Sequence, residues 1–142
     1  MVLVLWTGII LLAGTMPFSN FVGHSHWEDI QWTVRPRDWR SLKFYFDVIA
    51  NMTLFYPLGL LLARRFSARR TNSAFALVGA GLFVSICIEL FQVFCHNRHP
   101  SVIDLVSDTT GTALGVATAQ RVFSHWLLGA WFPPPHSHPT GS

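Results

Sequence analysis

Residues 74–119 read AFALVGAGLFVSICIELFQVFCHNRHPSVIDLVSDTTGTALGVATA, and this stretch decides the fold. It contains two apolar runs, 74–94 and 102–119, each close to the ~20 residues that a helix needs to cross ~30 Å of hydrocarbon. Each run also carries acid: Glu89 near the end of the first, Asp104 and Asp108 near the start of the second. A carboxylate at mid-bilayer costs ~2.5 kcal/mol or more, so we expect these acids to face a polar interior.

Two further apolar runs precede this stretch, at residues 2–18, which carry no charge, and 44–62, which stop just before Arg64. Overall, 51% of the 142 residues are hydrophobic and only 12% are charged, against about 25% charged residues in soluble domains. We therefore predict an all-α integral membrane protein with one domain, 1–142. Its four transmembrane helices are expected at residues 2–18, 44–62, 74–94 and 102–119.

Tryptophans mark the segments that we expect at the membrane surface. The loop between the first two runs mixes three of them with charged side chains, which favours the headgroup level. After Arg121, residues 122–132 are apolar but too short to span, and Pro133 then begins a Pro-rich tail, 133–142, that cannot continue a helix. The predicted interface anchors are Trp27, Trp32, Trp39, Trp126 and Trp131.

The charge pattern bears on partners and orientation. The formal charge of +3 is modest, and the basic residues lie beside apolar runs rather than in a stripe suited to nucleic acid, so membrane lipids are the expected partners and nucleic acid is not. Four spans would place five basic residues on each side of the membrane, so this count alone does not decide the orientation. The turn after the second run is purely basic, whereas the first loop also holds acids. We therefore predict a multi-pass protein of the bacterial inner (cytoplasmic) membrane with both termini in the cytoplasm.

The intramembrane polar residues fall into pairs with helical spacing. Asp47 and Asn51 lie near the start of run 44–62, Glu89 and Gln92 near the end of run 74–94, and Asp104 and Asp108 near the start of run 102–119. Since successive spans alternate in direction, all three pairs are expected at the same membrane face. Arg98 lies in the loop on that same face. The predicted polar cluster consists of Asp47, Asn51, Glu89, Gln92, Arg98, Asp104 and Asp108.

Small residues lie on the same stripe of the fourth run as its two acids. Gly111 and Gly115 form a G-x-x-x-G pattern, which lets another helix approach closely. Because this pattern lies on the face that carries Asp104 and Asp108, we expect both acids to point into the helix bundle rather than toward lipid.

Taken together, these motifs resemble the VanZ-like membrane protein family. The resemblance rests on NMTLFYPLG at 51–59, on Ser85-x-x-x-Glu89-x-x-Gln92, on Arg98, and on IDLVSDTTG at 103–111, and it covers about residues 44–115. It implies a small four-helix membrane protein, and the founding member of the family is associated with teicoplanin resistance. The family pattern usually has Asn at the position of Asp108. The expected helix-packing residues are Pro57, Gly59, Gly111 and Gly115.

Three roles remain open for the polar cluster. It can be a hydrogen-bonded network that fixes helix register, a pocket for a lipid headgroup or another polar ligand, or a catalytic site. In a catalytic site Glu89 or Asp104 would act as general base and Arg98 as an anion clamp, but no nucleophile is evident, so an enzyme is not favoured. No cofactor or metal is expected, because the spacing of His24, His26, His96 and His99 matches no tight ligand motif.

The principal functional prediction is an accessory subunit. A chain of 142 residues that lacks a soluble catalytic domain and is rich in lipid-level Trp and Phe suits a non-catalytic accessory or scaffold subunit of a larger membrane complex, docked on other integral subunits in part through residues 133–142. The alternative is a stand-alone VanZ-like protein that binds or processes a lipid headgroup or glycopeptide-type ligand, with a role in the envelope or in teicoplanin-type resistance.

Overall fold

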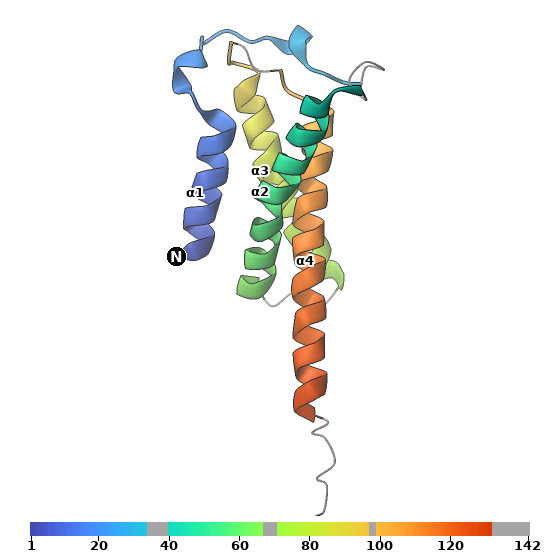
Figure 1. Ribbon diagram of the computed structural model, residues 1–142. Coiled ribbons are helices and arrows are strands. Elements are labelled where there is room, and N and C mark those ends of the chain that lie inside the picture. The colour runs from blue at the N-terminus through green and yellow to red at the C-terminus, as the bar shows by residue number, and fades with distance from the viewer. Residues whose placement is uncertain (34–39, 67–70, 97–98, 132–142) are drawn as a thin grey trace, which may run out of the picture.

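The computed structural model describes residues 1–33, 40–66, 71–96 and 99–131. Four α-helices alternate in direction along the chain (Figure 1), and the described residues contain no strand, only two isolated bridges. The all-helical fold with four helices is therefore confirmed. The helices are α1 (Val2–Thr15), α2 (Leu42–Phe66), α3 (Thr71–Gln92) and α4 (Val102–Trp131).

The helices differ in their capacity to cross a bilayer. By length and apolar composition, α2 and residues 73–92 of α3 qualify as spans. Helix α1 has 14 residues, which cover ~21 Å at 1.5 Å per residue and so fall short of the hydrocarbon core. Helix α4 continues beyond the predicted apolar run, through Arg121, to Trp131. No proline precedes Pro133 in this region, and arginine is a good helix former, so nothing ends the helix earlier.

The Trp-rich segment between α1 and α2 crosses one end of the bundle (Figure 1). It contains two single 3-10 turns, η1 (Phe18–Asn20) and η2 (Trp27–Asp29). Backbone hydrogen bonds dock it onto the loop after α3: the amide of Val22 donates to the carbonyl of Phe94 at 3.1 Å, and that of Gln31 to the carbonyl of Pro100 at 2.8 Å. In the described chain the segment is therefore held by main-chain pairing and by contacts of the Phe18 and Phe21 rings with Phe91 and Phe94.

The structure describes the side chains of only two of the five proposed interface anchors. Trp27 and Trp32 are exposed, as a side chain at the headgroup level would be. Trp39 lies outside the described residues. Trp126 and Trp131 belong to the last part of α4, where the description covers the backbone but not the side chains. Their anchoring role stays a prediction.

The tightest packing in the bundle joins α2 to α4, the most extensively contacting pair of helices in the described chain. A Cβ built on Gly59 would meet the backbone carbonyl of Thr112, and one on Gly115 would meet that of Tyr56. A Cβ on Gly111 would meet the main chain of Met52. The two backbones thus approach each other at three glycines, an approach that any side chain would obstruct.

Around this contact lies an apolar core contributed by all four helices. Its buried members include Ile10, Phe55, Leu58, Ile88 and Val116. Pro57 lies half-buried inside α2, where its ring removes one backbone donor without ending the helix. Three of these core residues, Ile10, Phe55 and Ile88, also line a cavity.

Gly115→Ala tests the α2–α4 contact. The added methyl group meets backbone that cannot rotate away, so we expect a loss of about 1–3 kcal/mol of stability, as for other overpacked sites. The matched control is Gly79→Ala, because a Cβ at Gly79 meets nothing within 4 Å and replacing a helical glycine by alanine gains about 0.5–1 kcal/mol. Thermal unfolding of both variants in detergent, followed by circular dichroism, checks the opposite signs. Equal melting temperatures would contradict the close approach.

Candidate functional site

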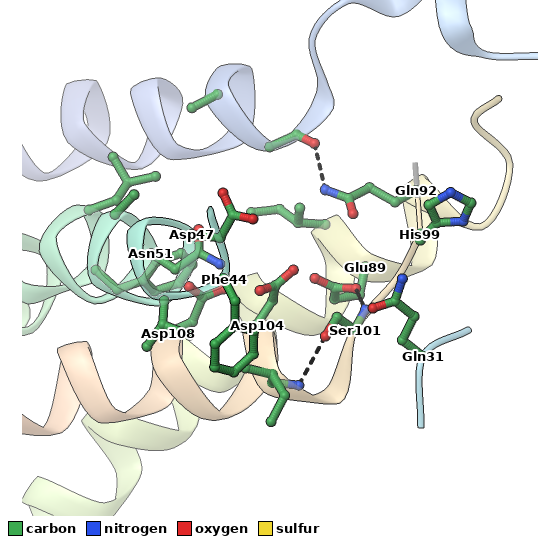
Figure 2. Close-up of a pocket in the computed structure, with 18 of the residues that line it drawn as sticks. Gln31, Phe44, Asp47, Asn51, Glu89, Gln92, His99, Ser101, Asp104 and Asp108 are labelled. Carbon is green, nitrogen blue, oxygen red and sulfur yellow. Dashed lines mark hydrogen bonds between the residues drawn. The ribbon is translucent and has the colours of Figure 1, made fainter. Parts of the chain in front are cut away.

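A cavity of about 800 Å³ lies at the end of the bundle where α2 and α4 begin and α1 and α3 end. One part of its lining is apolar and comes largely from α1 and α2 (Figure 2). The apolar lining consists of Ile10, Ala13, Gly14, Phe44, Val48, Ala50, Leu54, Phe55, Ile88 and Ile103. The polar lining consists of Gln31, Thr33, Ser41, Lys43, Asp47, Asn51, Glu89, Gln92, His99, Ser101, Asp104 and Asp108.

The structure brings six residues of the predicted polar cluster into this one cavity. They come from the start of α2, the end of α3 and the start of α4, as the helical spacing requires. The seventh, Arg98, lies outside the described residues. The six residues are Asp47, Asn51, Glu89, Gln92, Asp104 and Asp108.

Glu89 connects α3 to the start of α4. Its carboxylate Oε2 accepts the backbone N–H of Ser101 at 2.7 Å, and the side chain is only 8% exposed. The hydroxyl Oγ of Ser101 in turn accepts the backbone N–H of Ile103 at 3.2 Å. Ser101 therefore caps the first turn of α4, and Glu89 fixes the position of that cap.

Gln92 connects α3 to α1. Its amide Nε2 donates to the backbone carbonyl of Gly14 at 2.9 Å (Figure 2). A second bond from the indole Nε1 of Trp6 to the carbonyl of Leu54, at 3.0 Å, attaches α1 to α2. Glu89 and Gln92 thus serve the architecture of the cavity wall, as the register-fixing interpretation of the cluster expects.

Only one of the two carboxylate oxygens of Asp108 has a hydrogen-bond partner among the described residues. The hydroxyl of Ser85 on α3 donates to its Oδ2 at 2.7 Å, with Ser85 fully buried and Asp108 5% exposed. The other carboxylate oxygen, Oδ1, is buried and finds no hydrogen-bond partner among the described residues. Asp108 lines the cavity, but its unpartnered oxygen has essentially no accessible surface and so does not face that space.

Asp47, Asn51 and Asp104 complete the polar wall. Asp47 is exposed, while Asn51 and Asp104 are half-buried. Figure 2 shows the Asp47 side chain extending from α2 and the Asp104 side chain extending from α4 among the residues that line the cavity. In the described chain, Glu89, Gln92 and Asp108 bond to other segments, and all six described residues of the polar cluster line the cavity.

Two residues of the site are absent from the polar cluster predicted from sequence, Ser85 and Ser101. Ser85 donates a hydrogen bond to Asp108. Its position four residues before Glu89, on the same helical face, is the sequence signal for this role. Ser101 caps α4, and the pattern Ser101-x-x-Asp104 before an apolar run is a recognised helix-start signature. Both signals are local and could have been used.

The sequence pattern that defines the VanZ/LLP1 family matches residues 1–124. The chain belongs to the VanZ/LLP1 family. A comparison with curated proteins and with solved structures finds no match. The VanZ/LLP1 match includes α1 and the Trp-rich segment, which lie outside the motifs that carried the sequence resemblance, and every residue that lines the cavity.

Three histidines of this VanZ/LLP1 chain, His24, His26 and His96, lie close together without forming a metal site in the described residues. The rings of His24 and His26 lie 4.7 Å apart between centroids, and those of His26 and His96 5.7 Å apart. No group of three His, Cys, Asp or Glu side chains among the described residues has the arrangement needed to hold a metal ion. His99 lines the cavity separately.

Glu89→Ala tests the tie between α3 and α4. It leaves the half-buried amide of Ser101 without its acceptor, and we expect a loss of about 1–3 kcal/mol of stability. Glu89→Gln retains a carbonyl oxygen at the same position and should stay close to the wild type. Hydrogen–deuterium exchange of residues 99–105 measures the effect, with fast exchange expected only in the alanine variant. Similar exchange in both variants would contradict this role of Glu89.

Proposed function

We propose that this VanZ/LLP1 protein is a multi-pass membrane protein that binds the polar group of a lipid or similar amphiphile in the cavity. The observation that carries the proposal is the composition of the cavity wall. The lining combines aliphatic and aromatic carbon with carboxylates and amides. An amphiphile has the same two-part chemistry, and pockets with an apolar body and a few convergent polar groups are typical of ligand sites.

The membrane part of the proposal rests on α2, α3 and the outer surface of the bundle. Both helices are apolar enough to span, and large apolar side chains are exposed along them, including Phe46, Phe75 and Phe83 at about 70% exposure each. Lipid tails would cover such a surface, which is rare on soluble monomers. Because a bilayer can thin locally around a span shorter than its hydrocarbon core, we extend the proposal to α1 as well as α4. We place the protein in the bacterial inner membrane, with both termini in the cytoplasm beside the exposed Arg64 and Arg65.

The position of the cavity suits a headgroup. Its lining includes Gln31 and Thr33 of the segment between α1 and α2 together with residues from the first turns of α2 and α4. At 1.5 Å per residue, Asp108 lies ~9 Å along α4 from its first residue, which is the depth of the headgroup and upper acyl region. Binding, rather than catalysis, is proposed, since the described lining contains no activated nucleophile.

An accessory role in a larger membrane complex is the second proposal. One argument for it is the tail, residues 133–142, which lie outside the described residues. The other is the exposed apolar surface, which lipid could cover as well as partner subunits could. A role in the envelope or in teicoplanin-type resistance, or a glycopeptide-type ligand, rests on the family resemblance. The cavity favours ligand binding over these roles because it is a specific feature of the folded chain.

Filling the cavity tests the proposed function. Ala50 lines the cavity, and Ala50→Phe places a phenyl ring in it. Ala76 is also exposed on a helix but does not line the cavity, so Ala76→Phe is the matched control. Native mass spectrometry of the full chain, purified in mild detergent, should detect retained lipid on the wild type and the Ala76 variant, with at least a tenfold smaller bound fraction for the Ala50 variant. Equal retention by all three contradicts the proposal.

The same spectra test the accessory role. Stoichiometric copurification of other membrane proteins with the full chain would support it, and loss of those proteins after deletion of residues 133–142 would place the contact in the tail. A stable monomer that retains lipid supports ligand binding instead.

A further inference from the structure

One stripe of α2 changes from charged to apolar along the cavity. Its four residues follow one another at helical spacing and all line the cavity: Lys43, Asp47, Ala50 and Leu54. Each has accessible surface, since the first three are exposed and Leu54 is half-buried. The stripe covers ~16 Å of the helix at 1.5 Å per residue. A ligand in the cavity therefore meets charge near the start of α2 and hydrocarbon deeper along the helix.

Helix α1 bounds the apolar end of this stripe. The indole Nε1 of Trp6 donates to the carbonyl of Leu54 at 3.0 Å, and Ala13, about two turns later on α1, lines the cavity and is exposed. Beyond this bond the lining includes no described residue of α2 after Phe55 and none of α1 before Ile10. Both of these side chains are at most 2% exposed. The accessible space therefore ends at Leu54, where α1 and α2 are tied together.

The cavity continues onto the outer surface of the bundle on the side of α1 and α2. Ala50 follows the exposed Phe46 by one turn, and Ala13 follows the exposed Ile9 by one turn. Neither Phe46 nor Ile9 lines the cavity, and their exposed fractions of 70% and 47% belong to a surface that lipid tails would cover. The lining residues of α3, in contrast, are all buried. The cavity is therefore open between α1 and α2, at two small side chains.

We propose that the occupant is an amphiphile whose alkyl chain enters from the bilayer between α1 and α2, so that its polar group lies beside Lys43 and Asp47 and its chain ends at Leu54. The proposal rests on the proposed function and deepens it, because it adds the chain to the bound part of the ligand and gives its direction. The chain then runs from the headgroup level toward the bilayer interior, as the tails of neighbouring lipids do. A reversed ligand would bury its polar group at the apolar end, which costs free energy.

Ligands with only one kind of surface fit this stripe less well. An entirely polar ligand would leave the apolar end, at Ala50 and Leu54, in contact with water. An entirely apolar ligand would remove water from Lys43 and Asp47 without replacing its hydrogen bonds. A molecule with both parts, held in the proposed direction, matches the whole stripe.

Photo-crosslinking of the full chain in phosphatidylcholine vesicles tests the position and direction of the chain. The vesicles contain a trace of phosphatidylcholine that carries a diazirine either at the free end of one acyl chain or next to its ester. After irradiation, proteolysis and mass spectrometry locate the adducts. We expect the chain-end probe to label Leu54 and the ester-proximal probe to label residues 43–50 instead. The reverse pattern, or a Leu54 that neither probe labels, would overturn the proposal.

A free fatty acid with the same chain-end diazirine distinguishes two sources of the chain. Labelling of Leu54 by both probes supports the alkyl-chain class and shows that a single chain suffices. Labelling by the phospholipid alone supports the class and assigns the chain to a diacyl lipid.

Variants connect the labelling to the opening between α1 and α2. Ala13→Phe places a ring in the opening, so labelling of Leu54 by the chain-end probe should fall about tenfold, the effect of losing about two buried methylene groups. Leu12→Phe is the matched control, because Leu12 is exposed on the same helix but does not line the cavity. Phe83 on α3, 67% exposed, serves as the reference for bulk lipid and should be labelled equally in all samples. Equal melting temperatures by circular dichroism show that both variants are folded.

The outcomes separate this inference from the proposed function. If Ala50→Phe abolishes lipid retention but the chain-end probe does not label Leu54, the cavity holds the polar group alone and only the inference fails. If retention is insensitive to Ala50→Phe, the proposed function fails as well. If Leu54 is labelled equally in the Ala13 and Leu12 variants, the chain does not pass between α1 and α2 and the inference is wrong.

Discussion

The close approach of α2 and α4 is the constraint on which the rest of the structure depends. Three glycines, Gly59, Gly111 and Gly115, let the two backbones touch where any Cβ would collide with main chain. That contact fixes the rotation of both helices about their axes. Asp47 and Asn51 on α2 are then turned toward the face of α4 that carries its acids, and the polar wall of the cavity follows from packing further down the bundle. In a membrane, where no hydrophobic effect presses helices together, such steric fit is a main source of helix association.

The glycines set the contact between α2 and α4, and hydrogen bonds at the cavity end of the bundle attach α3 to α1 and α4. Glu89 holds the cap of α4, Gln92 holds the end of α1, and Ser85 orients Asp108. All three donors or acceptors lie on α3, which therefore acts as the common reference for the other helices at this end. Glu89 and Gln92 on α3 bond to other segments of the chain, and Asp108 on α4 is bonded to α3 through Ser85.

Helical spacing predicted much of this arrangement. Three pairs with helical spacing, together with four alternating helices, were sufficient to bring six cluster residues to one end of the bundle: Asp47 with Asn51, Glu89 with Gln92, and Asp104 with Asp108. Periodicity could not predict which acid would be tied to a backbone amide, because the partner of Glu89 is a main-chain group whose position depends on the loop. It also could not predict the length of α4, since loss of apolar character at Arg121 ends a hydrophobic run but not a helix. The main-chain hydrogen bonds that dock the segment between α1 and α2 were likewise beyond periodicity, because they do not depend on side-chain identity.

The attachment of α1 has a consequence for how the sequence can change. Both side-chain bonds that hold this helix, from Trp6 and from Gln92, end on backbone carbonyls, those of Leu54 and Gly14. Every amino acid carries a carbonyl, so the accepting half of each bond survives replacement at positions 54 and 14. Position 14 is restricted instead by packing, because a Cβ there would come within 2.6 Å of Ile88. These two hydrogen bonds therefore depend on the identity of the two donor residues. Substitution of Trp6 or Gln92 would remove a bond, whereas substitution of the residue that supplies the carbonyl would not remove the acceptor.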